Sequence, residues 1–180
     1  MALVDTHIHV FVRGLPLAPV RRYAPDYDAP IDAYVTRMRD HGISHAVIVQ
    51  PSFLGTDNSF MCATLRTNRS QLRGIAVVDP GISDAELSAL ASDGVVGIRL
   101  NLDGLPIPRF DRGPWPALLA GVKRRGWQVE VHREGRDLPP DLSLGRDRVE
   151  ARRRLWPADR AEAQGRRHRL RSQVQHPALP

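Results

Sequence analysis

The feature that most constrains the fold is a rhythm of strand-like and helix-like segments repeated over residues 1–137. Each unit reads as a short apolar run, a loop, a helix-like stretch and a glycine before the next run. The middle three runs are almost continuously β-branched and apolar, as in parallel strands that are covered on both faces. The five strand candidates are residues 3–10, 46–50, 74–78, 95–100 and 127–132.

The ends of the helix-like stretches support this interpretation. Ser83 to Glu86 have the spacing of a capping box, and Asp57 with Asn58 can cap the helix that begins directly after them. Pro30 and Pro114 fit the first turns of two helices. Gly42, Gly94 and Gly126 fit the carboxyl ends of three helices. Consecutive units of this kind predict an α/β fold with successive right-handed βαβ crossovers.

Composition excludes several classes of protein. No apolar run of about 18 residues is present, so a membrane-spanning helix is not expected. Cys62 is the single cysteine, which excludes an internal disulfide and makes a reducing cytoplasm the expected location. We expect Cys62 to be a core residue, and we expect no secretory leader because the first strand begins at once.

The rhythm stops after residue 138. Residues 138–180 hold ten arginines, no lysine and five acidic residues, whereas residues 1–137 are almost neutral. We interpret 1–138 as the folded unit and 139–180 as an irregular or disordered tail. One hypothesis is that the tail is out-of-frame sequence from GC-rich DNA, which the other two reading frames would test. The alternative is a non-catalytic protein whose tail binds nucleic acid or an acidic partner, although the absence of lysine argues against nucleic acid.

The strongest candidate site is Asp5-Thr6-His7-Ile8-His9. Side chains alternate along a strand, so Asp5, His7 and His9 are expected on one face. Two imidazoles at the carboxyl end of a parallel strand can bind a divalent metal or polarise a carbonyl. Asp5 could then orient one of the rings from behind.

Chemistry in a parallel βα array gathers where the strands end, and this rule selects further candidates. Arg99 suits a substrate carboxylate, because a guanidinium offers a two-donor fork, but a salt bridge inside the mouth is the alternative. Tyr23 lies in a long loop that could close over substrate or simply pack on the rim. The remaining candidates at strand ends are Ser52, Asn101 and His132.

These residues together resemble the amidohydrolase-related (amidohydrolase 2) family, and within it the 2-pyrone-4,6-dicarboxylate lactonase branch. The resemblance spans about residues 3–138 and is carried by an ordered set of motifs, since His-x-His alone is only moderately specific. The matching runs are residues 4–11, 22–25, 49–52, 55–58, 73–79, 97–101 and His132 with 135–138.

The resemblance implies a (β/α)8 barrel that hydrolyses a small carboxylated lactone, cyclic ester or amide. It implies that His7 and His9 polarise the scissile carbonyl, without a metal in the lactonase branch or around zinc in other members. It also implies that Tyr23, Ser52, Arg99 and Asn101 contact substrate and that His132 lines the pocket.

The chain departs from the family in length. A complete barrel needs about 250 residues and eight strands, and the sequence provides about five βα units. The family's later histidine and its final water-activating aspartate have no counterpart, so we expect impaired activity. A partial barrel would also leave unpaired strand edges, which predicts aggregation or association of copies.

Overall fold

The computed structural model describes residues 2–134 as a series of alternating strands and helices. The predicted irregular tail, residues 139–180, lies outside the described residues. The family-matching segment 135–138 also lies outside them. In chain order the elements are β1 (Val4–Ile8), α1 (Ile31–Asp40), β2 (His45–Val49), the 3-10 turn η1 (Ser52–Leu54), α2 (Ser59–Thr67), β3 (Leu72–Ala76), α3 (Asp84–Asp93), β4 (Val95–Asn101), α4 (Trp115–Arg124) and β5 (Gln128–His132).

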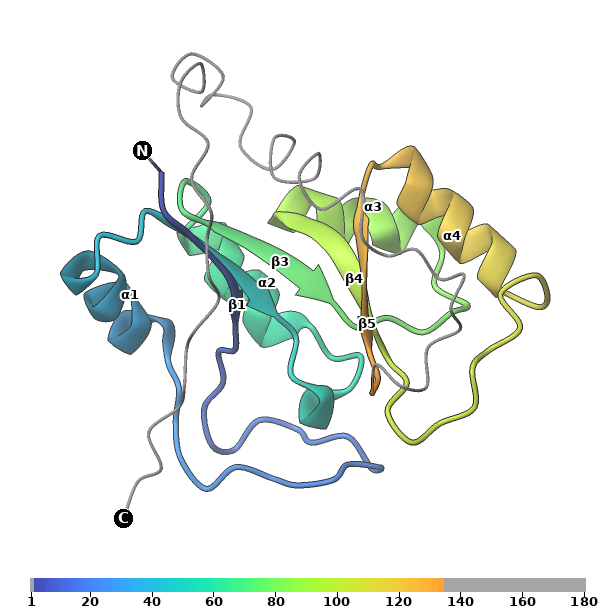
Figure 1. The fold of residues 1–180 in the computed structure, drawn as a ribbon, viewed down its shortest axis with the longest axis horizontal. Coiled ribbons are helices and arrows are strands. Elements are labelled where there is room, and N and C mark those ends of the chain that lie inside the picture. Colours follow the sequence, from blue (N-terminus) through green and yellow to red (C-terminus); the bar gives the residue numbers. More distant parts are fainter. Residues whose placement is uncertain (1, 135–180) are drawn as a thin grey trace.

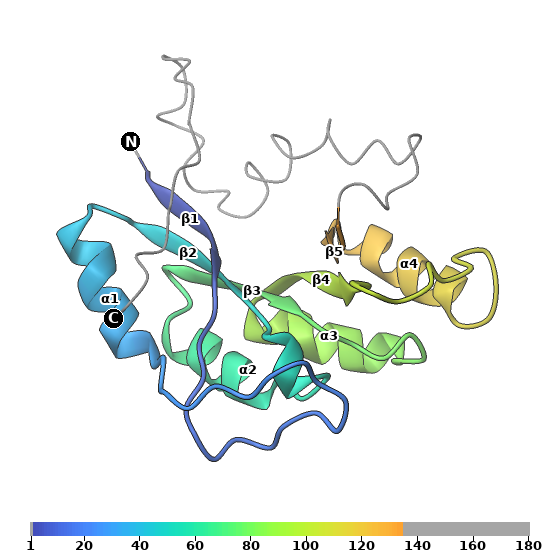
Figure 2. The same cartoon turned by 60° about the horizontal axis from the view of Figure 1, so that its bottom comes forward.

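The five strands form one parallel sheet in the order β1-β2-β3-β4-β5. The sheet is curled, and all four α-helices lie on its convex side (Figures 1 and 2). This arrangement confirms the predicted partial (β/α) barrel. The first strand is shorter than the predicted 3–10, and its register against β2 shifts between Asp5 and Ile8. No helix in residues 2–134 has the length and apolarity to cross a membrane.

Strand alternation divides the apolar residues between two faces. Side chains on one face of the sheet, such as Ile48 and Ile98, pack against the helices in two large clusters. Odd-numbered Val47, Val49 and Ile75 form a smaller separate cluster. All five lie on the central strands β2, β3 and β4 and are almost completely buried, so these strands are covered on both faces as their β-branched composition predicts.

Helix ends follow their local sequence signals with one exception. The Ser83 hydroxyl accepts from the Glu86 N–H while the Glu86 carboxylate accepts from the Ser83 N–H, which confirms the capping box. Gly94 ends the same helix in the left-handed conformation with φ of 106°. Asn58 does not cap α2 with its side chain, and Asp57 instead accepts from the N–H of Ser59.

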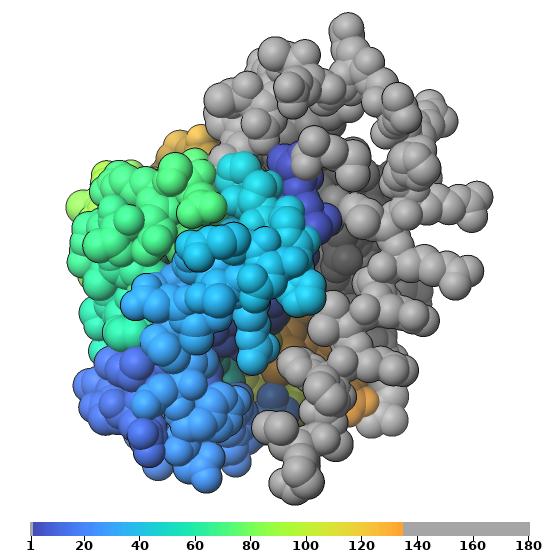
Figure 3. Space-filling model, turned by 90° about the vertical axis from the view of Figure 1, so that its left-hand side faces the viewer, coloured from blue at the N-terminus to red at the C-terminus, as the bar shows by residue number. Residues whose placement is uncertain are grey.

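The long loop between β1 and α1 lies at the carboxyl ends of the strands. It is pinned at both ends by mutual backbone hydrogen bonds between Phe11 and Ala29. Further along, the Arg22 guanidinium forms an ion pair with Asp103 in the loop that follows β4. The loop occupies the lower part of the face shown in Figure 3, below α1. Two loops far apart in sequence are thereby joined beside the strand ends.

Candidate active site

Three strands bring polar side chains to the same edge of the sheet. β1 leads into His7 and His9, and the register of β4 on β5 pairs Arg99 with Glu130. The next pair on the same face is Asn101 with His132. β1 pairs with neither β4 nor β5, so the curl of the sheet brings His7 to within 3.4 Å of Arg99 at the carboxyl ends of the strands.

His7 and His9 face each other. Their Nε2 atoms are 3.4 Å apart, and the rings meet edge to face with centroids 4.9 Å apart. The Nδ1 of His9 lies 2.7 Å from the carbonyl oxygen of Val49. A carbonyl oxygen can only accept, so a neutral His9 carries its proton on Nδ1 and presents a lone pair at Nε2.

Arg99 is a buried cation beside this pair, with 7% of its surface exposed. Its Nη1 donates to Glu130 Oε1 at 2.8 Å, and its Nε donates to Asn101 Oδ1 at 2.8 Å. The same Nη1 lies 3.4 Å from His7 Nε2. The salt bridge considered from sequence is therefore present, and it places the guanidinium against an imidazole.

The environment favours neutral imidazoles. Burial is the largest cause that lowers the pKa of His7, His9 and His132, and the positive charge of Arg99 acts in the same direction on all three. Burial also lowers the pKa of Arg99. The site at neutral pH is a cation surrounded by uncharged rings and one carboxylate.

Asp5 does not support an imidazole ring. Its carboxylate accepts from the Tyr34 hydroxyl at 2.5 Å and from the backbone N–H of His7 at 3.1 Å. The register shift that begins at Asp5 interrupts the strict alternation on which the expectation rested. The Val49 carbonyl, and not Asp5, is the hydrogen-bond partner that orients the His9 ring.

Tyr23 and Ser52 lie at the rim. The Tyr23 ring packs edge to face on Phe53 with centroids 5.3 Å apart, and it is 54% exposed. The Ser52 side chain is half-buried in η1 and makes no hydrogen bond within the described residues. Both alternatives for Tyr23 fit this position, because it packs on the rim and follows Arg22 in the loop that is joined to Asp103.

Sequence reasoning missed Glu130 and Asp103. Glu130 precedes His132 by two residues on β5, so strand alternation gave a signal for it. Asp103 pairs with Arg22 across 81 positions of sequence, and nothing local indicates that contact. Cys62 is buried, as predicted for a core residue.

The histidine pair matches part of a zinc site. Two imidazoles bound tetrahedrally at about 2.1 Å place their nitrogens about 3.4 Å apart, which is the separation of the His7 and His9 Nε2 atoms. Residues 2–134 contain no cluster of three His, Cys, Asp or Glu side chains suited to a metal. The Arg99 cation also lies beside one of the two nitrogens. The described residues therefore do not by themselves form a zinc site.

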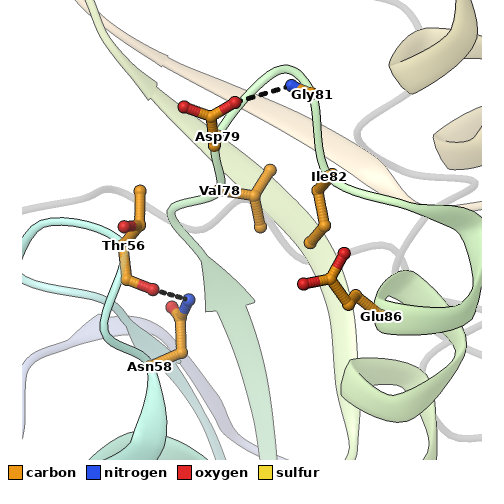
Figure 4. Close-up of a pocket in the computed structure, with 7 residues that line it drawn as sticks. All are labelled: Thr56, Asn58, Val78, Asp79, Gly81, Ile82 and Glu86. Carbon is orange, nitrogen blue, oxygen red and sulfur yellow. Dashed lines mark hydrogen bonds between the residues drawn. The ribbon is translucent and has the colours of Figure 1, made fainter.

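A separate hollow of about 290 Å³ lies between the start of α2 and the turn that leads into α3 (Figure 4). Its polar residues are engaged in holding these turns. Asp79 accepts from the N–H of Gly81, Asn58 donates to the carbonyl of Thr56, and Glu86 caps α3. The hollow shares no residue with the histidine site.

These parallel βα units define a partial (β/α) barrel whose polar residues gather where the strands end. The sequence profile of the amidohydrolase family matches residues 4–165, and the chain belongs to this family. That match extends beyond the boundary at residue 138 expected from composition.

Two curated relatives are lactone hydrolases. The 2-pyrone-4,6-dicarboxylate hydrolase of Comamonas testosteroni is 34% identical over 139 residues, covering 76% of this chain and 45% of the relative. The 4-sulfomuconolactone hydrolase of Rhizobium radiobacter is 35% identical over 97 residues, covering 53% of this chain and 32% of the relative. The chain spans less than half the length of either relative.

Solved structures agree on the fold. A probable 2-pyrone-4,6-dicarboxylic acid hydrolase from Acinetobacter baumannii, with citric acid bound, superposes with a TM-score of 0.71 at 41% identity, covering 73% of this chain and 49% of that one. A related structure from Pseudomonas putida has a TM-score of 0.66 at 48% identity, covering 73% of this chain and 48% of that one. A zinc-bound amidohydrolase from Burkholderia multivorans, 13% identical with a TM-score of 0.52 and covering 72% and 48%, shares the fold alone.

Proposed function

We propose that this chain carries the amino-terminal half of the active site of a hydrolase that opens a small carboxylated lactone. The observation that carries the proposal is the facing pair His7 and His9, with Arg99 3.4 Å from the same His7 nitrogen. The kinship to two lactone hydrolases supports the substrate class.

The roles follow from the hydrogen-bond geometry. A neutral His9 has its proton on Nδ1, so its Nε2 can accept a proton or a hydrogen bond. His7 Nε2 lies 3.4 Å from that nitrogen and 3.4 Å from Arg99 Nη1, and N–H groups of His7 and Arg99 would stabilise the oxygen of the scissile carbonyl as negative charge develops. His132 would line the same pocket, and Tyr23, Ser52 and Asn101 would contact substrate oxygens from the surrounding loops and strand end.

We propose that turnover by the 180-residue chain is slow. The Glu130 carboxylate among the site residues is paired with Arg99 through Oε1, and we assign it no role as a general base. Loss of a general base typically lowers a rate by about 10²–10⁴-fold. A divalent metal, if one is used, would need ligands in addition to the histidine pair.

The test is hydrolysis of 2-pyrone-4,6-dicarboxylate by purified protein, with and without zinc. The loss of pyrone absorbance measures the rate. We expect slow turnover that is reduced at least tenfold in His7→Ala and is unaffected by chelator. His41→Ala is the matched control, because His41 is an exposed histidine at the end of α1, near the amino ends of the strands and away from the site. Turnover equal in wild type and His7→Ala would overturn the assignment, and turnover that appears only with zinc would favour a metal-dependent ester or amide hydrolase.

A further inference from the structure

Among residues 2–134, Glu130 is the acidic side chain that contacts the buried guanidinium of the site. It lies opposite Arg99 in the β4–β5 register, and its Oε1 accepts from Arg99 Nη1 at 2.8 Å. The same oxygen is 3.7 Å from His7 Nδ1. One carboxylate oxygen of β5 therefore adjoins both the arginine and one histidine of the pair.

The guanidinium is held at two of its three nitrogens. Asn101 Oδ1 accepts from Nε, and Glu130 Oε1 accepts from Nη1. Within residues 2–134 no partner is present for Nη2. Two anchors fix the plane of a guanidinium, because the group is rigid and planar. A third nitrogen with unused donors is then presented in one orientation.

We propose that Glu130 is a positioning residue, which orients Arg99 so that Nη2 is available to a substrate carboxylate. This inference rests on the proposed function, since it assigns the anion that Arg99 receives. The alternative is that Glu130 only neutralises a buried cation. The two differ because glutamine keeps an acceptor oxygen at the same place but carries no charge.

The consequence for binding has a definite sign. Removing the acceptor frees the guanidinium to rotate, and ordering it again on binding costs affinity. Removing only the charge leaves the orientation intact and makes the site more positive, which favours an anion. Glu130→Ala should therefore weaken dicarboxylate binding at least tenfold, whereas Glu130→Gln should leave it unchanged or tighter.

The first measurement is hydrogen exchange at the Arg99 Nη1 hydrogens, which donate to Glu130, observed by ¹⁵N NMR and assigned with Arg99→Lys. We expect slow exchange in wild type and Glu130→Gln and exchange at least tenfold faster in Glu130→Ala. Asp111→Ala is the matched control, because it removes the carboxylate partner of the exposed Arg109. If Glu130→Ala does not fold, Glu130→Asp gives the same test, since its shorter side chain cannot keep the 2.8 Å contact.

The second measurement is the Kd for pyridine-2,4-dicarboxylate, a stable ring dicarboxylate, and for its uncharged diamide. We expect the tenfold loss in Glu130→Ala for the dicarboxylate only. Unchanged exchange in Glu130→Ala, or equal losses in Glu130→Gln and Glu130→Ala, would overturn the positioning role. If wild type orders the guanidinium through Glu130 but binds no dicarboxylate, the positioning of Arg99 stands and the proposed substrate class fails.

Discussion

Gly97 controls how closely β4 and β5 approach, and replacing it with alanine tests the strand pairing that builds the site. It lies opposite Gln128, two residues before Arg99. A Cβ added at Gly97 would lie 2.6 Å from the Gln128 backbone oxygen and 2.6 Å from its Cγ. Ordinary contact begins at 3.4 Å, so β5 would have to move by about 0.8 Å. Interstrand hydrogen bonds of about 2.9 Å would then exceed their useful length.

The expected cost follows from that displacement. Overpacking a well-packed position costs about 1–3 kcal/mol, and each lost ladder hydrogen bond costs about 0.5–1.5 kcal/mol. We expect Gly97→Ala to lower the free energy of unfolding by about 2 kcal/mol. With a urea dependence of about 2 kcal/mol per molar, the unfolding midpoint should fall by about 1 M. Tryptophan fluorescence during urea denaturation measures this shift.

Two further variants identify the clash. Gly104→Ala in the loop after β4 meets no atom within 4 Å and costs only its left-handed backbone, about 1 kcal/mol at φ of 70°. Gln128→Ala in the Gly97→Ala background removes the Cγ contact but keeps the backbone oxygen, so it should not restore stability. An unchanged midpoint in Gly97→Ala, or full rescue by Gln128→Ala, would refute the argument.

Three other predictions concern titration, capping and thiol chemistry. The pKa values of His7, His9 and His132 lie below the ordinary 6.5, so the folded protein binds fewer protons than the unfolded chain just below that pH. Their contribution to stability is complete above pH 6.5 and is lost as the pH falls below it; urea midpoints at about pH 7.5 and 5.5 should show a smaller drop in His132→Asn. Ser83→Ala should cost about 1 kcal/mol by thermal unfolding, and an unaltered Tm would contradict the capping role. Burial raises the pKa of the Cys62 thiol to about 11 from 9.0, so alkylation near pH 8 should be about 100-fold slower than in urea, and equal rates would show an accessible thiol.

The sequence predicted the features that depend on neighbours in the chain. The capping box at Ser83 and the stop at Gly94 are local hydrogen-bonding and backbone effects, so a few residues suffice to specify them. The facing histidines also followed from local geometry, because alternate strand residues share a face. The family resemblance added the substrate class.

The missed features depend on register and on loops that meet in space. Glu130 contacts Arg99 because β5 pairs with β4 in one particular register, which sequence periodicity does not fix. Arg22 reaches Asp103 only because the curled sheet brings two rim loops together. Asp5 was misassigned for the same reason, since a local register shift altered the strand alternation.

The division of the sheet into two faces separates stability from chemistry. Ile48 and Ile98 bury their side chains against the helices, in the clusters that hold most of the core. His7 and Glu130 lie on the opposite face and remain partly exposed, with side-chain exposures of 46% and 27%. Substituting His7 removes little buried apolar surface, so its variants should unfold near the wild-type midpoint. Arg99 and Glu130 differ, because the loss of either leaves its charged partner unpaired and Arg99 is buried. Activity or binding changes in His7 variants can therefore be interpreted as effects on the site, whereas those in Arg99 and Glu130 variants need the double substitution for comparison.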